Sequence, residues 1–370
     1  MAGAPTFKSN YLAPFDLNAA IDELRHRHGA FRKIEAVFET YKLSPGVGWD
    51  ALREKVGGGK KDSDEAAQCI AQMYLDVLLL GPRAICVYAD AAFDWKQLEA
   101  KAKALIITDG DFTEKYPIPL NQSQLKGVKD QLPQIVEIRP LQNGDLALIF
   151  SAVRHFDDRQ DIPKSQFPPA VANQMAHFER LVGFYQVHEQ AFDAIIISVS
   201  RSRLEVRVDA RARLPMDQYD ALVSSLFHQL STVLPQVSQL MTSAMNFFPA
   251  IREICDDKSQ GILESLWFTT HTGLINKERM KNRGEDLRSE TYHHGGLSAL
   301  GQPVSPYHLS VGFEKLTSAN NSITITLPGK IRDLNLPSPT LRLAIVEGCV
   351  TNEEFARAVN KLISLCSATE

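Results

Sequence analysis

Residues 200–215, SRSRLEVRVDARARLP, alternate between charged and apolar side chains. Every odd position from 201 to 213 carries a charge, and the even positions from 204 to 214 carry Leu, Val or Ala. A period of two residues is typical of a β-strand that has one buried and one exposed face. The stretch therefore predicts a strand with an apolar face and an arginine-rich face.

The segment before this strand, FDAIIISVS at residues 192–200, is apolar on both faces and predicts a second, buried strand. A tight reversal at residues 201–202 would join the two strands into an antiparallel hairpin. The expected cross-strand pairs are Val199 with Leu204, Ile197 with Val206 and Ile195 with Val208. All three apolar pairs then lie on one face, which makes the hairpin internally consistent.

The length and composition of the chain indicate a globular protein of α+β class with two mixed α/β domains. Its 370 residues exceed the usual size of a single core, and 44% hydrophobic with 23% charged residues is ordinary for folded domains. The polar segment 157–174, which contains three prolines, is the expected linker. We predict an N-terminal helical and mixed α/β domain at 1–156. A C-terminal α+β domain at 175–370 would carry an antiparallel sheet, built on the hairpin and packed by helices.

Apolar periodicity predicts further elements on both sides of the linker. Helices are expected near residues 17–41, 49–55, 62–79, 95–103, 122–131, 170–187, 215–233 and 240–254. Strands are expected near residues 83–90, 104–109, 134–141, 146–156, 266–270, 308–313, 322–327 and 341–350. The strand–helix–strand order at 83–109 predicts a parallel pair with a helical crossover. Thr351 and Glu354 have the spacing of a capping box that opens a last helix.

No segment of the sequence indicates a membrane span, a secretory signal or a cofactor motif. The N-terminus lacks a basic region followed by an apolar run, and the most apolar window, residues 74–81, is too short to cross a bilayer. The five cysteines are scattered without metal-binding or redox spacing. We therefore expect a cytoplasmic protein with reduced thiols, no membrane association and no cofactor.

The charged face of the predicted strand has several alternative roles. It could be a solvated face with ion pairs that contribute roughly 0–1 kcal/mol each, or helices could cover it and form an internal ion-pair layer. Its surplus of arginine also favours phosphate recognition, because the guanidinium group binds oxygens bidentately, or contact with an acidic protein surface. Since the net charge is −4, nucleic acid would need a local basic patch. The candidate contacts on this strand are Arg203, Arg207, Arg211 and Arg213.

A second candidate region is residues 269–296, TTHTGLINKERMKNRGEDLRSETYHHGG, which is too polar to form a core. A surface loop with histidines near a turn is the simplest interpretation. Its basic residues also suit a phosphate-binding or partner-binding loop; they are Lys277, Arg279, Lys281, Arg283 and Arg288. Imidazole and carboxylate groups could instead hold a metal ion that activates water. The candidates for that site are His271, Glu285, Asp286 and His293, which lack HExxH-like spacing.

Two functions of different classes follow from these regions. The favoured hypothesis is a non-enzymatic cytoplasmic binding component that contacts a polyanion such as nucleic acid, or a protein partner, through the strand and the loop. The helix near residues 17–41 could supply a homo-oligomer interface, although packing back within its own domain is the simpler interpretation. The alternative is a metal-dependent phosphodiester hydrolase that uses residues 269–296. Asp193, Glu205 and Arg207 also resemble the carboxylate layout of metal-dependent nucleases, with Arg where such sites usually have Lys.

Overall fold

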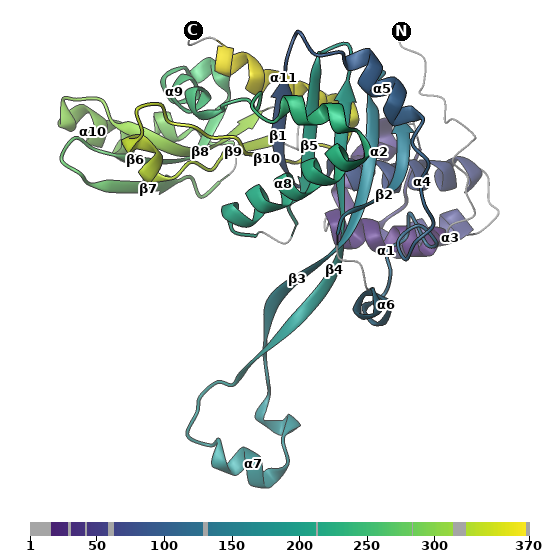
Figure 1. Cartoon of the computed structure of the whole chain (residues 1–370). Coiled ribbons are helices and arrows are strands. Elements are labelled where there is room, and N and C mark those ends of the chain that lie inside the picture. Colours follow the sequence, from purple (N-terminus) through teal and green to yellow (C-terminus); the bar gives the residue numbers. More distant parts are fainter. Residues whose placement is uncertain are drawn as a thin grey trace.

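The computed structural model describes residues 16–28, 31–40, 43–57, 63–128, 132–211, 214–282, 284–313 and 323–367. The helices are α1 (Leu17–His28), α2 (Phe31–Thr40), α3 (Gly48–Gly57), α4 (Ser63–Leu80), α5 (Trp95–Lys103), α6 (Gln122–Gly127), α7 (Pro169–Gln174), α8 (Met216–Val233), α9 (Phe248–Asp256), α10 (Thr291–Leu300) and α11 (Asn352–Ser367). The strands are β1 (Arg83–Ala89), β2 (Gln134–Pro140), β3 (Leu146–Asp161), β4 (Val182–Ser198), β5 (Arg203–Asp209), β6 (Ile262–Thr269), β7 (Ile275–Arg279), β8 (Ser305–Phe313), β9 (Ile323–Leu327) and β10 (Ala344–Glu347). These elements confirm the α+β class (Figure 1).

The strands of the described chain form one antiparallel sheet in the order β2-β3-β4-β5-β1-β10-β9-β8-β6-β7. Strand β1 pairs with β5 on one side and with β10 on the other. A strand from the first quarter of the chain thus lies between two strands from its second half. The predicted division into 1–156 and 175–370 therefore does not follow the sheet.

Helices pack against both faces of this sheet. Leu78 from α4, Ile251 from α9 and Phe355 from α11 belong to the apolar cluster on one face. Trp95 from α5 and Leu226 from α8 belong to the cluster on the opposite face. Because burial of each such side chain contributes about 1.5–3 kcal/mol, these two layers supply the main stabilisation of the fold.

The predicted hairpin exists as β4 and β5, but its register differs from the expected one by two residues. Ile197 pairs with Leu204, and Ile195 pairs with Val206. The turn spans Val199 to Ser202, longer than the expected two-residue reversal, and Ser202 has a φ of 48°. A shift of two residues leaves every side chain on its expected face, so the alternation in the sequence could not detect it.

The charged face of β5 is buried, which corrects the expectation of a solvent-accessible arginine face. Arg203, Glu205, Arg207 and Asp209 are each less than 5% exposed. They lie on the sheet face that α1 and α11 cover, because Arg207 pairs with Ile85, whose side chain belongs to that core cluster. Of the alternatives for this face, the internal ion-pair layer is the one observed.

Strands β3 and β4 continue beyond the body of the sheet as a two-stranded ribbon with α7 at its end (Figure 1). The predicted linker at 157–174 is the far part of this ribbon and its tip. The helix expected at 170–187 is wrong beyond Gln174, because β4 begins at Val182. We call residues 155–188 the arm.

Two further predictions have opposite outcomes. Residues 105–110 form no strand, and Ile106 is exposed there, so the predicted parallel crossover is wrong. The capping box at α11 is confirmed: Glu354 N donates to Thr351 Oγ1 at 3.1 Å, and Thr351 N donates to Glu354 Oε2 at 3.3 Å. Within the described ranges, no helix combines the length and apolar character that a membrane span requires.

Candidate interaction arm and its charged root

The arm is an unbroken antiparallel ladder that leaves the body of the protein. Pairing continues from His155 opposite His188 to Asp161 opposite Val182. Figure 1 shows the ribbon twisting away from the sheet and ending in the short helix α7. An isolated two-stranded ribbon is only marginally stable in water, so the arm gains little from its own pairing.

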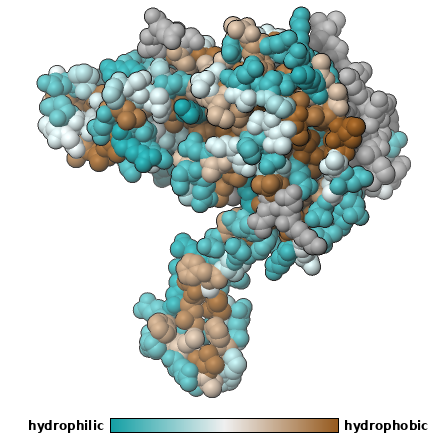
Figure 2. Space-filling model, viewed as in Figure 1, coloured by the Kyte–Doolittle hydropathy of each residue, from teal (hydrophilic) through white to brown (hydrophobic). Residues whose placement is uncertain are grey.

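The arm exposes large apolar side chains along its outer part. Phe178, Val182, Phe184 and Tyr185 are exposed, and Phe184 reaches 76%. Figure 2 shows hydrophobic patches on the surface of the arm. Val182 and Phe184 lie on one face of the ribbon and Tyr185 on the other. Exposed apolar patches are typical of protein, membrane or ligand contact surfaces.

Charges of both signs are distributed along the arm. Its acidic residues are Asp157, Asp158, Asp161 and Glu179, and its basic residues are Arg159, Lys164 and Arg180. Near the tip, Arg180 Nη2 donates to Asp161 Oδ2 at 2.7 Å in an exposed ion pair. Because the two signs nearly balance, the arm has no concentrated positive charge for a polyanion, and its net charge is too small to repel another protein surface strongly.

A buried charge network anchors the root of the arm to the body. Arg154 on β3 donates to the carboxylate of Asp193 and to the carbonyl oxygen of Asp209. Asp193 Oδ1 in turn accepts a hydrogen bond from the main-chain N of Asp209 at 2.7 Å. Charge-assisted hydrogen bonds in a low-dielectric site are strong and directional. The network therefore fixes the direction in which β3 and β4 leave the sheet.

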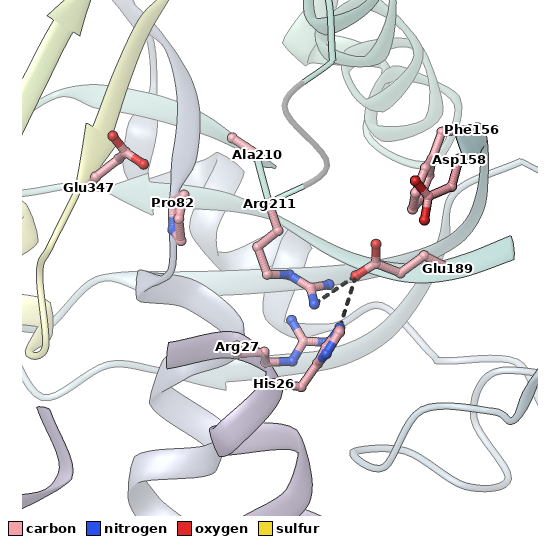
Figure 3. A pocket seen from close by; sticks show the side chains of 9 residues that line it. All are labelled: His26, Arg27, Pro82, Phe156, Asp158, Glu189, Ala210, Arg211 and Glu347. Carbon is pink, nitrogen blue, oxygen red and sulfur yellow. Dashed lines mark ion pairs between the residues drawn. The ribbon is translucent and has the colours of Figure 1, made fainter. Parts of the chain in front are cut away.

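A pocket of about 410 Å³ lies beside this root (Figure 3). Arg211 Nη1 lies 2.7 Å from Glu189 Oε1, His26 Nε2 lies 4.0 Å from the same oxygen, and Arg27 Nη1 lies 3.4 Å from Asp209 Oδ2. The lining residues are His26, Arg27, Pro82, Phe156, Asp158, Glu189, Ala210, Arg211 and Glu347. Because both arginines already face carboxylates, an anionic ligand would have to displace an existing ion pair.

The carboxylates of the buried layer remain ionised at neutral pH. Burial by itself would raise the pKa of Asp209, but Arg211, Arg83 and Arg27 outweigh that effect and hold the pKa well below its ordinary value. Burial likewise opposes ionisation of Glu205, and Arg207 with Arg203 lower its pKa overall. Both groups thus favour the folded state only while they are charged.

The stability of the protein is therefore expected to fall in acid. A carboxyl with a depressed folded-state pKa contributes stability above its unfolded pKa of about 4, and this contribution is lost as the pH falls through the folded value. Denaturant unfolding from pH 7 to pH 3 should show a decline that begins below about pH 5. Asp209→Asn should reduce the slope of the free energy of unfolding against pH. Asp158→Asn, on the exposed arm, is the control and should retain the parental slope. Equal slopes in the two variants would contradict the assignment of this acid sensitivity to Asp209.

The arginines predicted to bind a polyanion are not available as a group. Arg203 donates to Glu205 and Asn360, and Arg207 donates to Glu205 while its guanidinium carbon lies 3.9 Å from the centre of the Phe355 ring. Arg211 lines the root pocket, where it forms ion pairs with Glu189 and Asp209. Arg213 lies outside the described residues.

The basic residues predicted in the second region differ in exposure. Lys277, Arg279 and Lys281 are exposed on and after β7. Arg288 is buried, where it donates to Asp286 and to the carbonyl oxygens of residues 254, 257 and 261, so its role is structural. Arg283 lies outside the described residues.

The four residues proposed to hold a metal ion have separate surroundings. His271 is exposed in the turn between β6 and β7, and Glu285 Oε1 accepts from Asn282 Nδ2 at 3.0 Å. Asp286 pairs with Arg288, and His293 on α10 hydrogen-bonds to Glu278, a partner that the sequence did not indicate. In the described part of the chain, no group of three or more His, Cys, Asp or Glu residues could hold a metal ion.

The nuclease-like set is divided between the two faces of the sheet. Asp193 pairs with Phe150, which belongs to the cluster under α5 and α8. Arg207 pairs with Ala194, which belongs to the opposite cluster. Side chains on opposite faces cannot bind one ion, and Glu205 is neutralised by its two arginines.

Sequence reasoning missed the arm as an interaction element. Its signal was the group of β-branched and aromatic residues directly before the buried strand, namely Val182, Phe184, Tyr185 and Val187, which favour an extended conformation. Comparison with models of known protein families and with curated proteins finds no match to this sequence.

Proposed function

We propose that this protein is a non-enzymatic binding component that associates with a second copy of itself through the arm. The observation that carries the proposal is the ordered ribbon with exposed Phe178, Phe184 and Tyr185. A partner that covers these side chains would remove apolar surface from water at about 25 cal/mol per Å². Such a gain would also compensate for the marginal stability of a two-stranded ribbon.

The charges on the arm favour a second copy over a polyanion. Four acidic and three basic side chains within residues 155–188 allow like surfaces to meet with opposite charges in contact. The arginines Arg203 and Arg207, which would have contacted phosphates, are neutralised inside the protein. A symmetric contact between two arms would be self-complementary, as two-fold interfaces require.

Removal of the arm tests the proposal directly. Phe156 and Val187 are directly opposed in the ladder, so residues 157–186 can be replaced by Asn-Gly, which closes a two-residue hairpin. Sedimentation and light scattering at about 1–100 μM should give a dimer mass for the parent and a monomer mass for the shortened chain. The thermal midpoint of the shortened chain should stay near the parental value, which would show that the body folds without the arm.

Point variants separate the apolar contact from the shape of the arm. Phe178→Ser, Phe184→Ser and Tyr185→Ser in one chain should weaken association at least tenfold. Val47→Ser with Ile106→Ser is the matched control, because both side chains are highly exposed on the body. A monomeric parent at 100 μM, or a dimer that survives loss of the arm, would overturn the proposal.

The proposed setting is the cytoplasm. All five cysteines have free thiols, and burial raises the pKa of Cys255 to about 11 and that of Cys69 to about 12. Thiols of this kind are unreactive and persist in a reducing compartment.

A further inference from the structure

Strand β7 is the last strand of the sheet and has β6 as its neighbour on one side. On its other side, no strand lies among the described residues, so its outer main-chain groups face outward. Figure 1 places β7 at the end of the sheet remote from the arm. An open edge of this kind can accept an additional strand from another chain.

The opposite edge of the sheet, strand β2, is protected against the addition of another strand, whereas β7 is not. Strand β2 has an irregular register between Ile135 and Glu137 and ends at Pro140, which has no N–H to donate. Bulges and prolines are common means of blocking strand addition. Strand β7 has a regular register from Ile275 to Arg279 and contains no proline.

One face of β7 and its continuation is positively charged. Lys277, Arg279 and Lys281 are exposed, and no ion pair found among the described residues involves them. The one carboxylate of the strand, Glu278, is turned to the other face, where it hydrogen-bonds to His293. Alternate positions along the strand therefore present cations without a neutralising partner.

The side chain of Lys277 is positioned by the neighbouring strands. Its Nζ lies 4.3 Å from the centre of the Trp267 ring, and His308 stacks on that ring at 3.9 Å and 10°. Burial, with the nearby Lys277, lowers the pKa of His308 to about 4, so the imidazole adds no charge at neutral pH. Lys277 is thus held by a cation–π contact that leaves its charge exposed.

Apolar surface adjoins these cations at the start of the strand. Leu274 is 59% exposed and Ile275 is 51% exposed. A ligand that fits this edge therefore needs an extended main chain, carboxylates at alternate positions and an apolar residue near one end. Nucleic acid fits less well, because the Trp267 ring already contacts His308 and Lys277 and is not free to stack on a base.

We infer that β7 binds an acidic peptide in extended conformation, which pairs with the strand as an added edge. Its carboxylates would contact Lys277 and Arg279, and its main chain would complete the hydrogen bonds of the open edge. This site is separate from the arm and does not depend on arm-mediated association.

The test uses a labelled ten-residue peptide of alternating Glu and Val, with binding measured by fluorescence anisotropy on the full chain. Lys277→Glu with Arg279→Glu should weaken binding at least tenfold. The control variant has the same change in charge at two exposed residues of α5, Lys96→Glu and Lys101→Glu. It should bind the peptide as tightly as the parent protein. The chain without the arm should also bind like the parent.

Two further probes distinguish strand pairing from charge alone. Two peptides of the same sequence are N-methylated, one at the odd-numbered amides and one at the even-numbered amides. Both keep the carboxylates, but neither can form every hydrogen bond of a full ladder. At least one of them should bind at least tenfold more weakly than the unmethylated peptide. Binding of both methylated peptides as tight as that of the unmethylated peptide, or no binding of the unmethylated peptide at 1 mM, would overturn the inference. Binding of a single-stranded oligonucleotide in place of the peptide, with the same sensitivity to Lys277→Glu and Arg279→Glu, would assign the patch to nucleic acid instead.

Discussion

Replacing Glu205 with Ala is expected to lower the free energy of unfolding by about 3–5 kcal/mol. The carboxylate lies between Arg203 and Arg207, and all three side chains are buried under α11. Its removal leaves two guanidinium groups in a low-dielectric layer without their counter-charge. Denaturant unfolding of parent and variant at pH 7, with equal m-values, measures the loss.

A triple replacement is the control for this prediction. Arg203→Met, Glu205→Leu and Arg207→Met together remove all three charges and keep similar volume, so the chain should unfold close to the parental free energy. A loss below 1 kcal/mol for Glu205→Ala alone would show that the remaining arginines are hydrated. A triple variant as unstable as the single one would show that packing, not charge, governs this layer.

Gly329→Ala is expected to destabilise the protein by about 3 kcal/mol, the upper end of the usual cost of overpacking. A Cβ at this position would lie 2.0 Å from the main-chain oxygen of Tyr307 and 3.6 Å from Ile251 Cδ1. The obstacle is the main chain of β8, which cannot rotate away as a side chain could. The segment after β9 would have to move from the sheet, and thermal unfolding should report a lower midpoint.

Gly127→Ala is the matched control for the crowded glycine. No atom lies within 4 Å of a Cβ placed there, and its φ is not in the positive region. Its free energy of unfolding should change by no more than about 0.5 kcal/mol. Similar midpoints for the two alanine variants would refute the close approach at Gly329.

The alternation in residues 203–209 was sufficient to predict β5 and the face on which each side chain lies. It could not tell whether the charged face meets water, since the cover comes from distant parts of the chain. Phe355 and Asn360 on α11 and Arg27 on α1 complete the layer. Guanidinium groups, normally a sign of the surface, are buried here because each has a carboxylate, amide or carbonyl partner.

The arm was misjudged because its composition resembles a linker followed by a helix. Prolines and polar residues at 157–174 are typical of loops, and apolar residues at Phe178, Leu181 and Phe184 have helical spacing. Tertiary pairing decides otherwise: β3 and β4 are already paired in the body, and each added pair extends an existing ladder. The four candidate metal residues have separate surroundings for a related reason, because the segment 269–296 contains a strand and a helix that place them on different elements.

The central place of β1 has a consequence for how the protein is made. Arg83 is opposite Asp209 on one side and Val346 on the other, so the middle of the sheet closes only when the final strand arrives. Contacts between such remote positions make folding slow. Until residues 344–346 have been made, that edge of β1 has no partner strand, and unpaired edges of this kind favour aggregation.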